Sequence, residues 1–363
     1  MSTARPEPPA GFLDAASSQP LHPAARSAWL TAVDQGWADP QRLHHEGRRA
    51  ALFLAAAREE VAAAFGARPD EVTFTGSGSA ALGQVVARFA GPGRALTSAV
   101  EHSAVPAALR TWAGEVVTVG VDRLGRVDPH DFAPKGGRPG GLAILQTANH
   151  EVGTRQPVTA VAEVLGKIPL ILDAAASVGR EPIAEGWAAL IASARKWGGP
   201  AGVGVLVDRR HPTANVLDFN DVPGAVAAAA ALTAVLADSR SEALRHTEMI
   251  ATLRAKLPNL ITDLELAGDP EDRLPHILNL SCLYVDGEAL VHELDRRDFA
   301  VSSGSACAST SGEPSHILAA MGVLTHGNIR ISLPNGVAAA DVERLITVLP
   351  DVVSRVRSEL AGV

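Results

Sequence analysis

The chain contains few cysteines, lysines and tyrosines. Two of its 363 residues are cysteine and one is tyrosine, and lysine occurs only at positions 135, 167, 196 and 256. Two cysteines cannot form a disulfide framework, and neither Cys282 nor Cys307 belongs to a spaced Cys/His set typical of metal sites. We therefore expect no metal site, and each cysteine is either an inert core residue or chemically active.

Blocks of positive charge are also absent. The chain has 32 basic and 40 acidic residues, a net charge of −8, and no run of lysine or arginine that would follow a phosphate backbone. We do not expect nucleic acid as a direct partner.

Apolar runs long enough to span a bilayer are missing as well. The longest nearly unbroken run, GAVAAAAALTAVLA at 224–237, is too short and rich in alanine to cross a membrane, and the N-terminus has no apolar core of signal-peptide length. The sequence favours a buried helix in a cytoplasmic protein with no membrane partner.

The apolar residues that are present follow an α/β pattern. They make up 47% of the chain, enough for at least one full core, and the length is typical of two domains. After helical periodicity at 23–66, short apolar runs alternate mostly with helix-length segments, which predicts a largely parallel sheet covered on both faces. The predicted strands are 71–75, 94–100, 114–121, 142–147, 169–174, 189–193 and 203–208.

A long helical stretch at 222–256 separates this pattern from a second, smaller αβ pattern that begins at residue 276. We place the domain boundary near residue 238. The predicted units are an N-terminal segment 1–20, a large domain 21–238 and a small C-terminal domain 239–363.

A Gly/Ser turn follows the first predicted strand, in FTGSGSAALGQVV. Ligands of open parallel sheets bind beyond the carboxyl ends of the strands. A strand, a turn and then a helix direct backbone N–H groups and the helix dipole at an anion, so Ser77, Gly78 and Ser79 are candidates for holding a phosphate. A plain turn before a capped helix is the structural alternative.

The same turn also fits the dinucleotide-binding fingerprint weakly. Gly76, Gly78 and Ala81 match its spacing, and Glu101 follows the next strand as a possible ribose partner. We keep this alternative open at the level of the residues.

Asp173 and Lys196 follow two further strands. A carboxylate at the buried end of a hydrophobic strand is costly unless it meets a cation or donors, so Asp173 is either a helix cap or a counter-ion for a protonated ring nitrogen. Lys196 lies beside Trp197 and two glycines, where partial desolvation would lower the pKa of its amine and favour a bond to an aldehyde. A solvated loop lysine is the alternative.

Asn149 and His102 also follow predicted strands. Asn149 would hydrogen-bond a ligand or form a turn, and His102 would stack on a flat ring or merely pack or cap.

Together, a phosphate loop, an acid and a lysine at successive strand ends are the parts that hold pyridoxal phosphate. The acid keeps the pyridine nitrogen protonated and the lysine binds the aldehyde.

Several motifs resemble the cysteine desulfurases, in the class V aminotransferase group of fold type I pyridoxal phosphate enzymes. The most specific is SSGSACAS followed by EPSHILAAMG, which is similar to the longer active-site cysteine loop of bacterial desulfurases. LHHEGR, EHSAV, TANHEVGTRQPV and GPAGVGVL are further landmarks, and the likeness runs from FLDAAS to NIRISL.

This resemblance implies a homodimer with a mostly parallel seven-stranded sheet in a large domain and a smaller C-terminal α/β domain that carries the cysteine loop. It implies conversion of L-cysteine to L-alanine, with sulfur passing to an active-site cysteine persulfide and then to a sulfur-acceptor protein. Cys307 lies among Ser, Gly and Ala because its thiol must reach both substrate and acceptor on a loosely packed loop. Cys282, among larger apolar residues, is interpreted as a core residue.

The resemblance also assigns roles to single residues. Lys196, Cys307 and His102 would be catalytic, with His102 also stacking on the cofactor ring, and Arg330 would hold the substrate carboxylate. The cofactor would be bound by Lys196, Asp173, His102, Asn149, Gly78, Ser79, Ser193 and Arg195, with Asn149 also near the substrate.

The sequence departs from the family pattern around the cofactor. Arg195 replaces a histidine and is expected to reach the phosphate, while Ala176 replaces a glutamine that contacts the ring hydroxyl. Residues 80–82 are apolar where the family has an acidic and two polar residues. The segment 211–223 lacks a threonine that contacts the partner subunit's cofactor in relatives, so we expect an altered contribution across the dimer, with Asn220 as the candidate residue. Three alternatives remain open: a C–S lyase of the ergothioneine type, a selenocysteine lyase, and a non-catalytic cofactor-binding paralogue.

Overall fold

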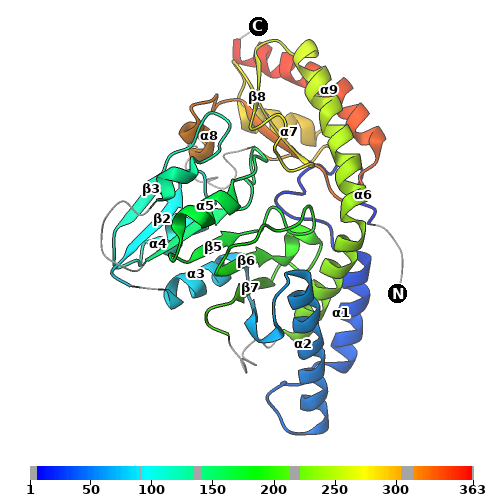
Figure 1. The fold of residues 1–363 in the computed structure, drawn as a ribbon. Helices are drawn as coiled ribbons and strands as arrows, with labels where there is room; N and C mark the ends of the chain where they lie inside the picture. Colours follow the sequence, from blue (N-terminus) through cyan, green and yellow to red (C-terminus); the bar gives the residue numbers. More distant parts are fainter. Residues whose placement is uncertain (1–5, 90, 134–140, 213–220, 304–313, 362–363) are drawn as a thin grey trace.

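Two β-sheets organise the chain (Figure 1). The computed structural model describes residues 6–89, 91–133, 141–212, 221–303 and 314–361. Within these residues, a seven-stranded sheet has the order β1-β7-β6-β5-β4-β2-β3 and a three-stranded sheet has the order β10-β9-β8.

The large sheet contains all seven predicted strands. They are β1 (Val72–Thr75), β2 (Arg94–Ser98), β3 (Val116–Val119), β4 (Gly141–Gln146), β5 (Leu170–Asp173), β6 (Ala189–Ser193) and β7 (Gly204–Asp208). Strands β3, β2, β4, β5 and β6 pair in parallel, whereas β7 runs antiparallel to both β6 and β1. The prediction of a mostly parallel sheet is therefore confirmed.

Helices cover both faces of this sheet because its central strands are apolar on both sides. Ile171 of β5 packs with α3 (Gly78–Arg88) and α4 (Ala104–Leu109). Its neighbours Leu170 and Leu172 pack on the other face, with α2 (His45–Ala64), α5 (Val158–Leu165) and the first half of α6 (Val222–Leu260). Helix α1 (Pro23–Gln35) packs against α6 (Figure 1). Alternate burial along β5 is the period of two expected of a strand.

Helix α6 is the one described helix that is long and apolar enough to cross a membrane by length and composition. Its alanine-rich first half instead packs in the main core, where Ala225, Ala228 and Leu232 are at most 1% exposed. The expectation of a buried helix at 224–237 is thus confirmed.

The small sheet is antiparallel and has its own core. Its strands are β8 (Leu264–Ala267), β9 (Ile277–Cys282) and β10 (Asn328–Ser332), and they pack with α7 (Gly287–Asp295) and α9 (Ala339–Ala361). Helix α8 (His316–Met321) packs instead with Val100, Val152 and Ala267. Cys282 is 0% exposed in the core of the small sheet, and burial raises the pKa of its thiol to about 11. Its interpretation as a core residue is confirmed.

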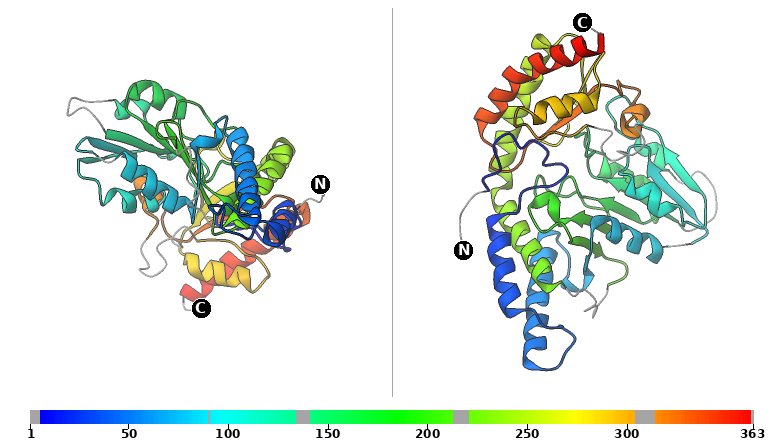
Figure 2. Two further views of the ribbon diagram at one scale, coloured as in Figure 1. Left: turned by 90° about the horizontal axis from the view of Figure 1, so that it is seen from below. Right: turned by 180° about the vertical axis from the view of Figure 1, so that it is seen from behind.

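Short 3-10 helices complete the described elements: η1 (Pro69–Glu71), η2 (Pro129–Phe132) and η3 (Ala194–Trp197). The N-terminal segment lies at the junction of the two sheets (Figure 2). The N–H of Leu13 donates to the carbonyl of Ala300 at 2.8 Å, and the N–H of Ser332 donates to the carbonyl of Leu13 at 2.7 Å. These bonds place residues 12–17 next to β10.

We predict that Leu172→Ala lowers the free energy of unfolding by about 2–5 kcal/mol, because it leaves a cavity beneath a side chain that is 0% exposed. Leu260→Ala is the matched control, since Leu260 is 51% exposed at the end of α6, and it should change stability by about 0.5 kcal/mol or less. Urea unfolding at neutral pH measures both. Equal losses in the two variants would contradict this placement of the core.

Candidate active site

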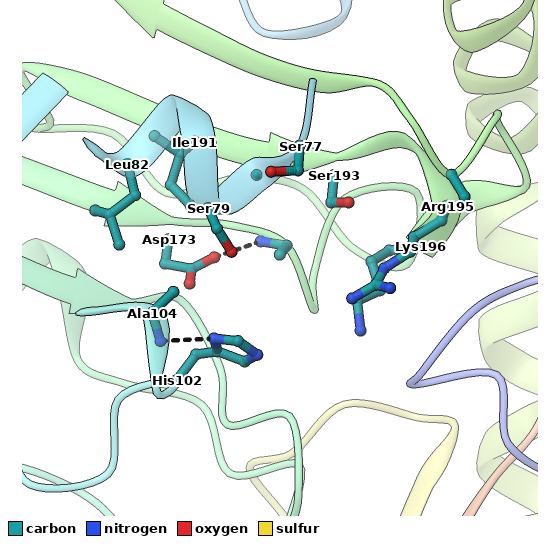
Figure 3. A pocket seen from close by; sticks show the side chains of 13 residues that line it. Ser77, Ser79, Leu82, His102, Ala104, Asp173, Ile191, Ser193, Arg195 and Lys196 are labelled. Carbon is teal, nitrogen blue, oxygen red and sulfur yellow. Dashed lines mark hydrogen bonds between the residues drawn. The ribbon is translucent and has the colours of Figure 1, made fainter. Parts of the chain in front are cut away.

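A cavity of about 140 Å³ lies where α3 begins and where β5 and β6 end (Figure 3). The sheet edge at the carboxyl ends of parallel strands is the expected ligand position. Most of the predicted site residues line it: Gly78, Ser79, His102, Asp173, Ser193, Arg195 and Lys196. The fold therefore brings together groups that are up to 118 positions apart in the chain.

The beginning of α3 supplies one wall of the cavity. The hydroxyl of Ser77 caps the helix by accepting from the N–H of Ala80 at 3.1 Å. A Cβ on Gly78 would lie 3.2 Å from the Cβ of Ser193 and 3.3 Å from the carbonyl oxygen of Ala192, so glycine allows the helix end to approach β6 closely. Helix N–H groups and the dipole favour an anion here, beside the hydroxyls of Ser79 and Ser193.

Asp173 ends β5 and is 9% exposed. Its Oδ1 accepts from the N–H of Ala175 at 3.0 Å (Figure 3), so the carboxylate caps the following turn and lines the cavity at once. Burial raises its pKa, while the N–H of Ala175 and the positive potentials of His102 and Lys196 lower it. A cationic ligand group would stabilise the charged form further.

His102 forms the opposite side of the cavity. Its Nδ1 accepts from the N–H of Ala104 at 3.1 Å (Figure 3), which assigns the ring proton to Nε2. Its ring lies 5.0 Å from that of His150 between centroids, at an interplanar angle of 55°. Burial lowers the pKa of both imidazoles, that of His150 well below its ordinary value. The capping alternative therefore holds for His102, together with a position beside the cavity.

Lys196 lies in η3 directly after β6 and is partly buried. Its ammonium donates to the carbonyl of Ala16 from the N-terminal segment. Burial and the positive potentials of Arg330 and Arg195 lower the pKa of the amine to about 8. The solvated-loop alternative does not describe this lysine, because its environment makes the neutral, nucleophilic amine accessible near neutral pH.

Asn149 does not line the cavity. It is 0% exposed, and its Oδ1 accepts from the N–H groups of Glu151 and Val152 at 2.8 and 2.9 Å. Its Nδ2 donates to the carbonyl of Val100 at 3.0 Å. This geometry corresponds to the turn-forming alternative, and it ties the turn after β4 to the residues that precede His102.

Arg330 lies on β10, 5% exposed. Its Nη2 contacts the carboxylate of Asp14 and the hydroxyl of Ser17, both at 2.7 Å, and its Nη1 donates to the carbonyl of His150 at 3.1 Å. The sequence analysis did not identify Asp14 or Ser17 as site residues. Their place in the FLDAAS landmark was the only signal, because local pattern does not show which distant residue they contact.

Glu101 is unsuited to a ribose partner. It is 2% exposed, and its Oε1 accepts from the hydroxyl of Ser98 at 2.6 Å and from the N–H of Gln146 at 3.2 Å. Burial raises its pKa to about 8. This arrangement does not support the dinucleotide interpretation of the Gly/Ser turn.

Cys307 lies outside the described residues, as do Asn220 and the rest of segment 213–220. Segment 304–313 contains Cys307, and the described residues on both sides of it are held near the cavity by hydrogen bonds. The N–H of Arg330 donates to the carbonyl of Ser302 at 2.6 Å. On the other side, the hydroxyl of Ser315 donates to Glu151 at 2.6 Å, and Nε2 of His316 lies 3.0 Å from the carbonyl oxygen of Glu101.

The groups around the cavity fit pyridoxal phosphate. One end has the α3 N-terminus with hydroxyl and guanidinium donors, which suit a phosphate. Asp173 suits a protonated ring nitrogen, and the amine of Lys196 suits an aldehyde. Ala176 packs beside Ala16 and Ala148 and offers no polar side chain.

We predict that Lys196 in the cofactor-free protein is acylated with half-maximal rate near pH 8, the pKa that its burial imposes, instead of near the ordinary 10.5. Competitive labelling with acetic anhydride, followed by peptide mass spectrometry, measures this directly. The denatured protein is the control, in which the midpoint should return toward 10.5. An unchanged midpoint in the folded protein would contradict the electrostatics described above.

Comparisons with known proteins agree with this geometry. Among solved structures, a NifS-like protein superposes with a TM-score of 0.86 over 95% of this chain and 100% of its own, at 24% identity, which shows the shared fold. DndA from Streptomyces lividans matches with a TM-score of 0.71 at 28% identity, over 89% of this chain and 99% of its own.

Sequence relatives cover nearly the whole chain. The cysteine desulfurase IscS of Dictyoglomus turgidum is 31% identical over 96% of this chain and 95% of its own. The cysteine desulfurase of Cereibacter sphaeroides is 35% identical over 96% of each chain. The sequence profile of the class V aminotransferases matches residues 12–219 and 219–345. The chain therefore belongs to the class V aminotransferase family and, within it, to the cysteine desulfurases.

Proposed function

We propose that this protein is a pyridoxal phosphate-dependent cysteine desulfurase, which converts L-cysteine to L-alanine and transfers the sulfur to Cys307 for delivery to an acceptor protein. The observation that carries the proposal is the single cavity lined by Lys196, Asp173 and the N-terminus of α3. Membership of a family that depends on this cofactor supports it.

The residues that would hold the cofactor follow from the chemistry of the cavity. Lys196 would bind the aldehyde, Asp173 the ring nitrogen and His102 the ring face. The phosphate would be held by the N-terminus of α3 with Ser79, Ser193 and Arg195. When bound, the cofactor supplies an electron sink next to the substrate Cα.

Arg330 would bind the substrate carboxylate. In the structure its charge is balanced by Asp14 and its guanidinium is aligned by Ser17 and the carbonyl of His150. Its Nε is buried without a hydrogen-bond partner among the described residues. We infer that Asp14 holds the guanidinium in position and that a substrate carboxylate exchanges with part of this contact.

Lys196 would move the proton. Its neutral amine would accept the Cα proton of the substrate, because its pKa of about 8 makes that form accessible near neutral pH. The thiolate of Cys307 attacks the substrate sulfur, so that an S–S bond forms, the Cβ–S bond breaks and its electron pair remains with the carbon fragment. Protonation of that fragment leaves alanine, and a persulfide stays on Cys307.

Arg195 distinguishes this chain from relatives with histidine before the lysine. It lines the cavity, and its permanent charge with several planar donors suits a phosphate dianion. Ala176 has no polar side chain to contact the ring hydroxyl of the cofactor. We assign no other residue to this contact. A contribution from the partner subunit through segment 213–220, including Asn220, lies outside the described residues.

Exposed apolar side chains on and between α1 and α2 support a homodimer. Large apolar residues occur at six positions between 29 and 52 and are between 42% and 88% exposed: Trp29, Leu30, Val33, Trp37, Leu43 and Leu52. Clusters of this kind on a protein surface usually mark an interface. We assign this α1–α2 surface to contact with a second copy of the chain.

The cytoplasm is the compartment that we propose, because a thiol that cycles through a persulfide requires reducing surroundings. The acceptor would be a protein that receives sulfur from Cys307.

We predict that Lys196→Ala and Cys307→Ala each lower alanine formation from L-cysteine by about a hundredfold or more, since each removes a group that reacts covalently. Alanine and sulfide release are measured with a reductant present. Cys282→Ala is the matched control, because Cys282 is the other cysteine and lies in the core, and it should retain activity.

Full alanine release by Cys307→Ala would contradict the proposed sulfur transfer and would identify a C–S lyase that needs no thiol. Release of selenide from selenocysteine with no reaction of cysteine would identify a selenocysteine lyase. A protein that is yellow from bound cofactor but reacts with neither L-cysteine nor selenocysteine would be a non-catalytic paralogue.

We predict that the wild type sediments at twice its chain mass of 37.6 kDa, and that the double variant Leu30→Glu, Trp37→Glu sediments as a monomer because it places charges in the apolar contact. Leu260→Glu, at an exposed position outside the α1–α2 surface, is the control and should remain dimeric. Analytical ultracentrifugation measures all three. A monomeric wild type, or a dimeric double variant, would contradict the assignment.

A further inference from the structure

A second cavity, of about 480 Å³, lies apart from the candidate active site and shares none of its lining residues. Its walls come from four segments: the turn after β4, the turn after β5, the middle of α6 and the residues before β9. Four arginines line it: Arg155, Arg180, Arg240 and Arg273. Nothing in the proposed desulfurase reaction uses them.

Two of these arginines are buried without a carboxylate partner. Arg180 and Arg273 are 5% and 8% exposed, and neither forms an ion pair with any described residue. Arg180 donates to Oδ1 of Asn335 at 2.6 Å, and Arg273 donates to the carbonyl of Leu274 at 3.3 Å. Both contacts are to neutral oxygens, so neither compensates the charge. A buried unpaired charge is costly.

The pKa values of these groups reflect the same imbalance. Burial lowers the pKa of Arg180 to about 9, against the opposing charge of Glu242, and lowers that of Arg273 to about 10. The positive charges of Arg254 and Arg155 lower the pKa of Arg273 further, and Asp269 opposes them. An anion in the cavity would reverse this repulsion.

The carboxylates of the cavity do not balance its arginines. Glu181 binds Arg155 at 2.5 Å, and Asp272, outside the lining, also contacts Arg155 at 3.3 Å. Glu271 is the other acidic residue in the lining. Among the lining residues themselves, four arginines face two glutamates, Glu181 and Glu271, an excess of two positive charges in a chain of net charge −8. This excess matches the charge of a phosphate monoester.

The remaining lining has apolar surface and room for more than a bare ion. Leu244, Pro182 and Pro275 form an apolar part of the wall, and Leu244 is 62% exposed. Thr247 and Ser239 add hydroxyls. The volume falls within the range of small-molecule sites, which combine apolar walls with a few charged groups.

We propose that this cavity binds a small phosphate monoester, with its phosphate among Arg180, Arg240 and Arg273 and its organic part against Leu244. Arginine suits this ligand because its planar guanidinium offers paired donors to phosphate oxygens.

Isothermal titration calorimetry tests the proposal with the cofactor-loaded protein, so that the phosphate position in the active site is already filled. The probes are inorganic phosphate, phenyl phosphate and benzoate, titrated at constant ionic strength in chloride. Phenyl phosphate should bind most tightly, because it offers both the phosphate and an apolar ring. Benzoate, with one charge on a planar group, should bind more weakly.

Arg240→Gln is the decisive variant, because Arg240 is exposed on α6 and its loss should leave the fold intact. It should weaken phenyl phosphate binding about tenfold or more, the effect of losing a charge-assisted hydrogen bond. Arg273→Gln should weaken it at least as much. Arg110→Gln, which removes an exposed arginine after α4, is the matched control and should bind as the wild type does.

Three results would overturn the proposal: no heat of binding from phenyl phosphate at millimolar concentration, equal affinities of Arg240→Gln and Arg110→Gln, or benzoate binding as tightly as phenyl phosphate. None of these measurements depends on turnover of L-cysteine, so the outcome is independent of the proposed desulfurase activity.

Discussion

Lys196 is partly buried at the end of β6, and the arrangement of the surrounding residues depends on compensating its charge. An ammonium removed from water needs compensation, and here it comes from the carbonyl of Ala16 and, more distantly, from Asp173 and Asp14. The turn that carries the lysine is held rigid by Trp197, whose indole N–H donates to the carbonyl of Ala228 at 3.0 Å, and by Gly198 at φ 84°. A reactive amine is thus positioned by packing on both sides of it in the sequence.

The N-terminal segment joins the two sheets at this point. Asp14 pairs with Arg330, while the backbone around Leu13 pairs with Ala300 and Ser332. The side chain of Gln19 accepts from the N–H of Asn335, and the backbone N–H of Gln19 donates to the carbonyl of Arg195. Lys196, Arg330 and the residues that flank the segment containing Cys307 are therefore placed by one set of interactions across the junction. A change in the position of the small sheet would alter all three.

The sparing use of lysine is consistent with this chemistry. Arginine supplies nearly all of the 32 basic residues. Its ordinary pKa is so high that even the buried Arg180, whose pKa falls to about 9, stays charged at neutral pH, whereas the lowered pKa of Lys196 lies closer to neutrality. Arg180 and Arg273 are buried and remain donors to carbonyl or amide oxygens. Lys196, by contrast, has the pKa of about 8 that a nucleophile requires. The two residue types thus separate permanent charge from reactivity in this protein.

The sequence by itself determined the elements whose signals are local. All seven strands of the large sheet, the buried helix at 224–237 and the burial of Cys282 follow from apolar period and length, because a strand or helix buries its own apolar face wherever it packs. The presence of Asp173 and Lys196 at strand ends, and of a capped helix at Ser77, was visible for the same reason.

Only the tertiary structure decided how these pieces meet. β8 and β10 were not predicted, since each is short and depends on pairing with β9. The antiparallel direction of β7 and the tilted contact of His102 with His150 have no local signature. Asp14 meets Arg330 across 316 positions. Such contacts depend on the packing of the whole chain. Many pairings satisfy the same local pattern, and the native one has the lowest free energy.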